Sequence, residues 1–392
     1  MNRENRFDII IAGAGAAGLT LLWYILNSPV LQKREILLLD KSFEPKNDKT
    51  WCFWDSNDLP LNEFIYHSWN ELEVGALGSS FNEELITYRY DCIRNGDYSM
   101  AILDTAKNFE NITFIEASIQ NFSSDEKIAV VETDKGKFTA SHVFQSVLKP
   151  PDFETSTVDN SLLQHFVGWE IETDSSLFNP DKAVLMDFNV PQLNGVTFMY
   201  ILPFSENRAL IEHTLFSDTL LEQDVYEGEI RNYLSEHYDL GSARYKILRK
   251  EKGAIPMEDR KYSTWYCENV MNIGTMGGLT KPTTGYTFTR IHKKSIEIVS
   301  ALERDEKIPE DAVSSYRFRV YDMMLLYLLS SDQHTSVRIF HDLFKKNSFD
   351  MILRFLEEKT TLSNEISIFS TLPYLPFFKS IYKMKHRIFT GR

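Results

Sequence analysis

The pattern of apolar positions in the first forty residues predicts a strand, a helix and a second strand. Residues 7–12 contain three consecutive isoleucines and a single acid, which is typical of a buried β-strand. Residues 19–26 carry apolar side chains at helical spacing, and residues 35–40 form a second short apolar run that ends in an acid. Because a helix joins two buried strands, we expect a βαβ unit whose strands lie parallel in one sheet.

A glycine-rich segment follows the first predicted strand directly. Gly13, Gly15 and Gly18 have the spacing that allows a tight turn, a close approach of the backbone to a pyrophosphate, and close packing of the helix on the strand. Asp40 ends the second strand, where a carboxylate can bind the hydroxyls of an adenosine ribose and disfavours a ribose phosphate. The alternative is a glycine-rich turn without a ligand. Since all these features agree, we expect a dinucleotide site for FAD or NAD rather than NADP.

After residue 150 the apolar pattern changes to one strand after another with short turns. Two prolines within residues 149–152 mark the change, because proline breaks both a helix and a strand ladder. The predicted strands are residues 164–172, 183–188, 196–204 and 208–216. Strands in this succession predict an antiparallel sheet rather than a continuation of the parallel one.

A third pattern begins near residue 265. Residues 269–274 predict a strand, a second glycine-rich stretch follows, and from Ile291 onward the spacing is helical. We expect an α/β fold with a Rossmann-like nucleotide-binding domain, an antiparallel-sheet substrate domain and a helical C-terminal region. The predicted boundaries are 1–150 with 265–310 for the first, 151–264 for the second and 311–392 for the third.

Composition narrows the class of protein. The 392 residues are 43% hydrophobic and 25% charged, which is ordinary for a globular chain. A formal net charge of -14 makes nucleic acid an improbable partner, because the average surface repels phosphate. Three scattered cysteines suit a reducing cytoplasm and argue against a disulfide framework, and His165 and His213 have no third ligand at metal spacing, so we expect no metal site.

Several separated motifs, in order along the chain, resemble the bacterial lycopene β-cyclase family. Beside the glycine fingerprint, these motifs are residues 50–54 (TWCFW), 164–169 (QHFVGW), 185–188 (LMDF), 202–205 (LPFS), 209–214 (ALIEHT) and 277–286 (GGLTKPTTGY). The resemblance implies a flavoprotein isomerase of carotenoid biosynthesis. Such an enzyme cyclises the acyclic ends of lycopene to β-ionone rings, giving γ-carotene and β-carotene without net redox change. It needs reduced FAD, with NAD(P)H as the expected reductant. One departure is His213, which stands after Glu212 where many relatives carry a second acid.

Cyclisation of a hydrocarbon needs one strong acid in an apolar wall and π-rich or negative groups near the developing cation. Alternation in the strand 208–216 places Leu210, Glu212, Thr214 and Phe216 on one face, so Glu212 is the leading candidate for the acid. An exposed strand carboxylate is the alternative. Asp187, which the same alternation places on the face of Leu185, is a weaker candidate for a second acid or a structural charge partner.

The second glycine-rich stretch is expected to bring backbone amides and a helix start near the flavin. Gly277, Gly278, Thr284 and Gly285 are the candidate residues, and the segment 282–284 (PTT) predicts the helix start. A flexible loop is the alternative.

The aromatic motif near residue 50 is the candidate wall for a polyene. Trp51, Phe53 and Trp54 are expected either to line a substrate tunnel and cover the flavin, or to be ordinary core aromatics.

The C-terminal segment bears on location. After Glu365 it holds no acid but combines cations with aromatic and aliphatic residues: Lys379, Lys383, Lys385, Arg387 and Arg392 among Phe377, Phe378, Ile381, Tyr382, Ile388 and Phe389. Such a segment suits anionic headgroups, and lycopene resides in the bilayer. We therefore expect a cytoplasmic protein bound peripherally to the inner face of the cell membrane. A tail packed on the body with solvated charges is the alternative.

Three other functions fit parts of the pattern. A flavin-dependent aromatic hydroxylase usually has Gly-Asp where this chain has Gly274-Thr275. An isoprenoid reductase has a similar substrate but would consume NADPH stoichiometrically. A non-catalytic prenyl-lipid carrier of the same fold would not need the intact glycine fingerprint and Asp40. The sequence leaves open one-ring against two-ring products and the oligomeric state.

Overall fold

A sheet with a parallel centre and antiparallel additions, called the parallel sheet below, forms the first part of the molecule. The computed structural model describes residues 5–56, 58–125, 127–241, 244–310 and 314–390, without the side chains of the last two. The predicted βαβ unit is confirmed as β1 (Arg6–Ala12), α1 (Ala16–Leu26) and β2 (Ile36–Asp40), with β1 parallel to β2. The sheet continues through β8 (Ile112–Glu116), β9 (Ile119–Ser124), β10 (Ala129–Thr133), β11 (Gly136–Gln145), β17 (Trp265–Cys267) and β18 (Val270–Asn272).

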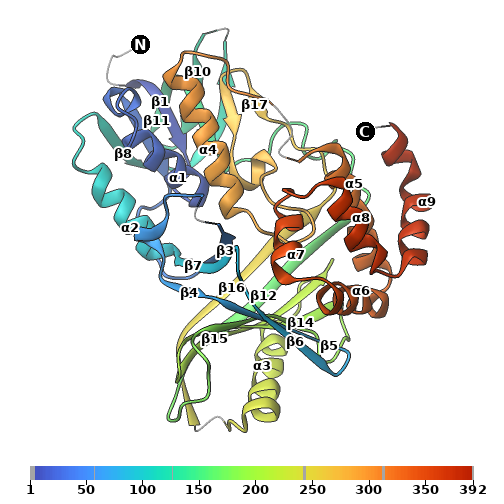
Figure 1. The fold of residues 1–392 in the computed structure, drawn as a ribbon. Coiled ribbons are helices and arrows are strands. Elements are labelled where there is room, and N and C mark those ends of the chain that lie inside the picture. The colour runs from blue at the N-terminus through green and yellow to red at the C-terminus, as the bar shows by residue number, and fades with distance from the viewer. Residues whose placement is uncertain (1–4, 57, 126, 242–243, 311–313, 391–392) are drawn as a thin grey trace.

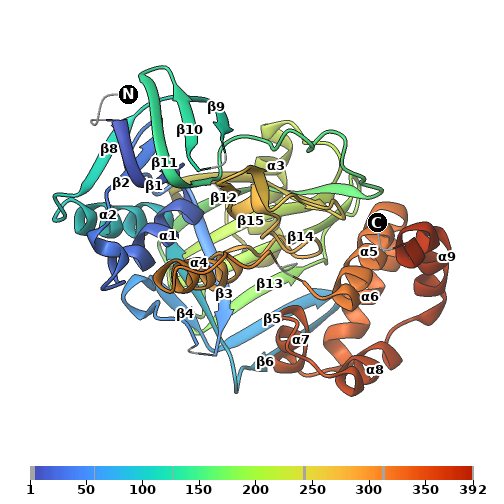
Figure 2. The ribbon, with the colours of Figure 1, turned by 90° about the horizontal axis from the view of Figure 1, so that it is seen from above.

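Helices cover one face of this sheet, as Figures 1 and 2 show. They are α1, α2 (Asn95–Ala106) and α4 (Phe288–Glu303), which pack with Ile9, Ile11 and Leu38 of the strands in one apolar core. Short 3₁₀ turns complete this part of the chain: η2 (Leu31–Lys33), η3 (Asn62–Phe64) and η5 (Gly274–Gly277). The strand 269–274 of the prediction is thus confirmed as β18, which pairs parallel with β11.

A seven-stranded sheet forms the second part, with β12 (Ser161–Thr173) between β15 (Arg208–Ser217) and β16 (Tyr245–Glu258). Beyond β15 follow β14 (Val196–Ser205), β13 (Lys182–Asp187), β5 (Glu71–Ala76) and β6 (Ser79–Glu84). The four strands predicted after residue 150 are all present. The boundary at 150 is wrong for residues 71–84, because β5 pairs parallel with β13 and so adds two early strands to the second sheet.

The two faces of the seven-stranded sheet have different covers. On one face, Trp169, Ile211 and Leu215 pack against α3 (Gln223–Tyr238), a helix that the sequence pattern did not indicate. On the other face, Leu210 and Phe216 pack against the C-terminal helices. A small antiparallel sheet of β3 (Thr50–Asp55), β7 (Arg89–Arg94) and β4 (His67–Trp69) is the third sheet of the fold (Figure 1).

The predicted helical C-terminal region is confirmed. It consists of α5 (Tyr316–Ser331), α6 (Gln333–Lys346), α7 (Phe349–Leu356), α8 (Leu362–Ser370) and α9 (Tyr374–Thr390). Polar residues start three of these helices: Asp332, Ser348 and Thr361 each accept a hydrogen bond from a backbone amide of the first turn. None of the helices in the described part of the chain is long and apolar enough to cross a membrane.

The predicted helix start at 282–284 is wrong. These residues form a turn, and α4 begins only at Phe288. Gly285 has a φ of +71°, a left-handed conformation that interrupts a helix. The segment is therefore a fixed turn beside the cavity described next.

Candidate active site

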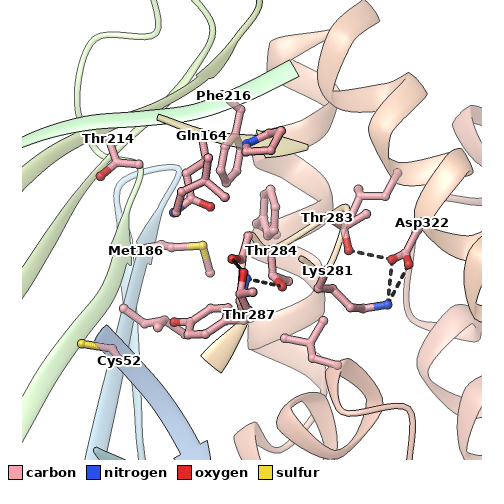
Figure 3. Close-up of a pocket in the computed structure, with 18 of the residues that line it drawn as sticks. Cys52, Gln164, Met186, Thr214, Phe216, Lys281, Thr283, Thr284, Thr287 and Asp322 are labelled. Atoms are coloured by element: carbon pink, nitrogen blue, oxygen red, sulfur yellow. Dashed lines mark hydrogen bonds and ion pairs between the residues drawn. The ribbon is translucent and has the colours of Figure 1, made fainter. Parts of the chain in front are cut away.

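A cavity of about 1010 Å³ lies where the parallel sheet, the seven-stranded sheet and the C-terminal helices meet (Figure 3). At one end it is lined by Gly15, Ala16 and Ala17 at the start of α1. Its lining continues along the strands of the second sheet and reaches Phe377 and Ile381 on α9. Most of this wall is apolar or aromatic, which suits a hydrocarbon ligand.

The glycine fingerprint forms the first end of the cavity. Gly13 has a φ of +113°, and a Cβ on Gly18 would lie 1.8 Å from the carbonyl oxygen of Gly13. Both positions therefore require glycine for the turn and for the packing of the helix on the strand. A Cβ on Gly15 would meet nothing within 4 Å, so the open space at this glycine belongs to the cavity.

Asp40 is hydrogen-bonded to the fingerprint segment but is not among the residues that line the cavity. Its carboxylate accepts a hydrogen bond of 2.5 Å from the amide of Ala14 and one of 2.6 Å from the amide of Lys41. No side chain caps the N-terminus of α1. The backbone amides of its first turn therefore have no side-chain acceptor at this end of the cavity. An uncapped helix start, open space at Gly15 and an acid at the end of β2 fit the pyrophosphate and ribose of a dinucleotide.

The second glycine-rich segment divides into two parts. Thr284 and Gly285 line the cavity, whereas Gly277 and Gly278 are not among its lining residues. A Cβ on Gly277 would lie 2.5 Å from the carbonyl oxygen of Asn272, and Gly278 has a φ of +71°. These two glycines shape the turn that carries the segment to the cavity, and they are not part of its wall.

Gln164 is a lining residue that the sequence analysis named only as part of a motif. Its Oε1 atom is buried and has no hydrogen-bond partner among the described residues. A Cβ on Gly285 would lie 2.6 Å from that oxygen, so the amide of Gln164 stands beside the turn 282–285 (Figure 3). An unpaired buried acceptor in a ligand cavity indicates a polar group of the ligand as its partner.

Glu212 lies in the middle of the cavity wall. Glu212, Thr214 and Phe216 all line it, as the alternation of β15 predicts, and Glu212 is only 5% exposed. Burial raises the pKa of Glu212 well above its usual range, and the neighbouring carboxyl of Glu251 raises it further. The position of Glu212 in the sheet therefore favours its protonated, neutral form. The alternative of an exposed strand carboxylate is excluded.

His213 projects from the opposite face of β15. Its ring lies 5.8 Å from the ring of Tyr226 on α3, and burial lowers its pKa to about 4. On the same side, His165 is hydrogen-bonded to Ser217 and Tyr226. The residue that departs from the family pattern is thus separated from the acid by the sheet. Within the described residues no group of three or more His, Cys, Asp and Glu side chains can hold a metal ion.

The expectation that Asp187 shares a face with Leu185 is wrong. A register shift between Val184 and Met186 places Leu185 and Met186 together on the cavity side. Asp187 then lies on the opposite face, where it accepts a hydrogen bond of 2.8 Å from the hydroxyl of Tyr233 on α3. It does not line the cavity, and its contacts are those of a structural partner.

Two of the three candidate aromatic residues of β3 lie at the cavity. Trp51 and Trp54 line the cavity, whereas Phe53 is not among its lining residues and belongs to the core beside the parallel sheet. The ring of Trp54 lies 4.5 Å from that of Tyr286. Trp51 and Trp54 are therefore wall residues of the cavity, whereas Phe53 is an ordinary core aromatic residue.

Three tyrosine hydroxyls form a chain beside the acid. The hydroxyl of Tyr90 lies 2.6 Å from that of Tyr200 and 2.5 Å from that of Tyr286. Tyr200 is the cross-strand neighbour of Glu212, and burial raises the pKa of all three phenols. The rings therefore stay neutral and offer electron-rich faces next to Glu212.

A buried ion pair, absent from the sequence analysis, connects the turn 282–285 to the C-terminal helices. Lys281 Nζ lies 2.8 Å and 2.9 Å from the two carboxylate oxygens of Asp322 on α5, and 2.9 Å from Glu358 Oε1. The hydroxyl of Thr283 donates to the same Asp322 (Figure 3). The polar contacts thus fix the turn against α5 at the cavity wall.

The far end of the cavity reaches the surface at α9. Tyr374 and Phe378 line the cavity although they are 66% and 64% exposed. Lys379 and Lys383 are exposed on the same helix, whereas Arg387 is buried and pairs with Asp259 at 3.3 Å. The tail is therefore partly packed and partly exposed. Arg392 and the side chain of Phe389 lie outside the described residues.

Comparisons with known proteins agree with this site. The model of the "Lycopene cyclase protein" family matches residues 8–382. The lycopene beta-cyclase of Pantoea ananas is 23% identical over 96% of this chain and 98% of its own length. The lycopene beta-cyclase of Paracoccus sp. (strain N81106 / MBIC 01143) is 26% identical over 71% of this chain and 70% of its own length.

Solved structures show the same fold at lower identity. A flavoprotein/dehydrogenase of Cytophaga hutchinsonii has a TM-score of 0.64 and 11% identity, covering 97% of this chain and 100% of that one. A geranylgeranyl bacteriochlorophyll reductase-like protein of Thermoplasma acidophilum has a TM-score of 0.59 and 12% identity, covering 97% and 99%. The family match extends over nearly the whole chain and includes every element of the site. The chain therefore belongs to the lycopene cyclase family of enzymes.

Proposed function

We propose that this protein is an FAD-dependent lycopene β-cyclase that converts the acyclic ends of lycopene to β-ionone rings, giving γ-carotene and β-carotene. The observation that carries the proposal is the position of Glu212. It is a buried carboxyl, with a pKa raised by burial, in the wall of a largely apolar cavity that begins at a dinucleotide fingerprint. The names of the curated relatives support the same substrate class.

In the proposed reaction Glu212 gives its proton to the terminal double bond of the polyene, which leaves a tertiary carbocation. An internal double bond attacks this cation and closes the ring, and loss of a proton from a neighbouring carbon restores neutrality. One proton enters and one leaves, so the substrate is neither oxidised nor reduced. The tyrosine faces beside Glu212 and the ring of Trp54 stabilise the positive charge as it develops.

The fingerprint residues hold the cofactor in this proposal. The amides at the start of α1 bind the pyrophosphate and Asp40 binds the ribose, while Gln164, Thr284 and Gly285 form the wall nearby. These residues would hold reduced FAD, with NAD(P)H as its reductant, and the bound flavin would supply negative charge or a proton-transfer group beside the cavity. The chain's own side chains orient the polyene and exclude water.

We further propose that the protein is cytoplasmic and binds the inner face of the cell membrane through α9. The exposed aromatic residues Tyr374 and Phe378 line the same cavity as Glu212, so a hydrocarbon passing from a bilayer to the acid meets apolar side chains. Lysines on this helix suit anionic headgroups.

The test is the pigment profile of lycopene-accumulating cells that express this chain, resolved by chromatography. We expect β-carotene or γ-carotene with the native chain, and only lycopene with Glu212→Gln, which keeps the shape of the side chain but carries no acidic proton. The purified variant should retain its flavin absorbance. Unchanged lycopene with a folded, flavin-loaded native protein would exclude the cyclase function. Stoichiometric consumption of NADPH with a reduced product would indicate an isoprenoid reductase instead.

A further inference from the structure

A second glutamate stands beside Glu212 in the sheet. Strand β12 lies between β15 and β16, and Gly168 of β12 pairs with Glu212 on one side and with Glu251 on the other. Residues directly opposite each other in neighbouring strands project from the same face of a sheet. The two carboxyl side chains therefore flank one residue that has no side chain.

Gly168 leaves the space in which the two carboxyl groups meet. A Cβ at this position would lie 2.7 Å from Glu212 Cγ and 2.9 Å from Glu212 Oε1, both closer than real Cβ contacts. The side chain of Glu212 thus lies over Gly168, on the side of the sheet that Glu251 shares. Any larger residue at 168 would force the Glu212 carboxyl out of this position.

Glu251 is held from behind by two donors. Arg249 Nη1 lies 2.5 Å from Glu251 Oε2, and the hydroxyl of Thr50 donates to the same oxygen at 2.9 Å. Arg249 is fixed in turn by its hydrogen bond of 2.9 Å to Glu170 Oε2. Arg249 and Thr50 both bind Oε2 of Glu251, which leaves its other oxygen, Oε1, to accept a hydrogen bond from Glu212.

We propose that Glu212 and Glu251 form a carboxylic acid–carboxylate pair that shares one proton over Gly168, with Glu251 as the positioning residue that keeps the proton on Glu212. The pair itself follows from the geometry of the sheet, and its role in ring formation rests on the proposed cyclase function.

The pair has a chemical consequence for the proton cycle. When Glu212 gives its proton to the polyene, two negative carboxylates lie beside each other, and Glu212 faces the new carbocation from the cavity wall. Their charge stabilises the cation, and their mutual repulsion makes Glu212 a ready acceptor for the proton that the substrate loses. The pair then returns to its first state with no net change of protons.

Other titratable groups also face Glu212. None of them is changed in the variants of the test below, so they do not account for a difference between those variants. Cys52 of β3, Tyr200 of β14 and Tyr286 of the turn after Gly285 lie on this side, and burial raises the pKa of each. Arg249 of β16 lowers the pKa of Glu212, whereas Glu251 raises it. Lys252, which lines the cavity, is exposed to solvent.

The test is an infrared titration of the purified, flavin-loaded protein, because a protonated carboxyl has its own C=O stretching band. Glu212→Gln removes this band and so assigns it. In the native protein the band should persist above the pH at which ordinary glutamates ionise. In Glu251→Gln the like charge is lost and an amide can donate to Glu212, so the band should disappear at a pH lower by about one unit or more, a tenfold change in the protonated fraction.

Two further variants make the test specific. Gly168→Ala should shift the band in the same direction as Glu251→Gln, because its Cβ separates the two carboxyls. Glu258→Gln, also on β16 but hydrogen-bonded to Arg260 and Ser161, should leave the titration unchanged. An equal titration of the native protein and Glu251→Gln, with both folded and flavin-loaded, would overturn the pair.

Activity gives a separate readout. Cyclisation needs protonated Glu212, so the rate falls as pH rises through its pKa, and in Glu251→Gln this fall should move to lower pH by the same amount as the band. The two proposals can fail separately. If the band shifts as expected but neither the native chain nor any variant cyclises lycopene, the carboxyl pair is supported and the proposed function is wrong. Cyclisation by Glu251→Gln with the native pH profile would show that Glu251 has only a structural role.

Discussion

The environment of single side chains decides the chemistry of this site. Glu212 is an ordinary strand glutamate in its local sequence, and becomes an acid because the sheet buries it beside Tyr200, Glu251 and the cavity. Asp187, on a strand of the same sheet, turns to the other face and bonds a tyrosine of α3. The same chemical group thus lies in the cavity wall at one position, where we propose that it acts as the acid, and serves packing at another.

A prediction at this scale concerns Asp40. Replacing Asp40 by Ala removes the acceptor at the end of β2 and should weaken FAD binding by about 10- to 100-fold, the range for a lost hydrogen bond to a charged group. Fluorescence titration of the apoprotein with FAD measures this affinity. Asp104→Ala, at an exposed aspartate paired with Lys107, is the matched control and should bind FAD as the native protein does. An affinity equal to that of the control would contradict the assigned contact.

At the scale of elements, sequence patterns succeeded where packing is regular. Period-two alternation places Glu212 in the cavity because β15 is buried on both faces and has no bulge. The same rule fails at Asp187 because a register shift in β13, between Val184 and Met186, reverses the faces from Met186 onward. Strand β16 was not predicted, since it is an edge strand of mostly exposed and half-exposed charged residues without an apolar run, and so Glu251 was missed.

Helix α9 carries a prediction about the membrane. Replacing Lys379, Lys383 and Lys385 together by Gln should weaken binding to anionic vesicles by about 100-fold, since each cation near a charged surface contributes about 1 kcal/mol. Sedimentation with phosphatidylglycerol-containing vesicles at low salt measures the change. A triple Lys→Gln variant at the exposed positions Lys33, Lys107 and Lys135 makes the same change in net charge elsewhere. Equal losses in the two triple variants would argue against α9 as the docking element.

At the scale of the whole molecule, the site exists only where three parts of the chain meet. The fingerprint comes from the parallel sheet, the acid from the seven-stranded sheet, and much of the apolar wall from the helices after residue 314. The sequence predicted each part, but local patterns do not show which faces will oppose one another. The cavity, the ion pair of Lys281 and the pairing of β5 with β13 are all contacts between segments distant in sequence.

Lys281 gives a prediction at this scale, because it joins two of these parts. Lys281→Met leaves Asp322 buried without its cation and should lower the free energy of unfolding by about 3–5 kcal/mol, measured by urea denaturation. The double variant Lys281→Met/Asp322→Leu should recover part of this loss, since Glu358 keeps its pair with Arg290. Lys307→Met, at an exposed pair, should cost less than about 1 kcal/mol. If Lys281→Met were as stable as Lys307→Met, the ion pair of Lys281 with Asp322 would not stabilise the contact between the two parts.

The glycine between the two glutamates also constrains how this protein can evolve. A side chain at 168 is excluded only while Glu212 lies over that position, so a change at 168 also requires the side chain at 212 to move, whereas a change at 251 does not make room for it. A lineage that lost the carboxyl at 251 would be released from selection for glycine at 168 only once the acid at 212 had also moved. The constraint on position 168 therefore comes from position 212, which is distant in the chain and adjacent across two strands.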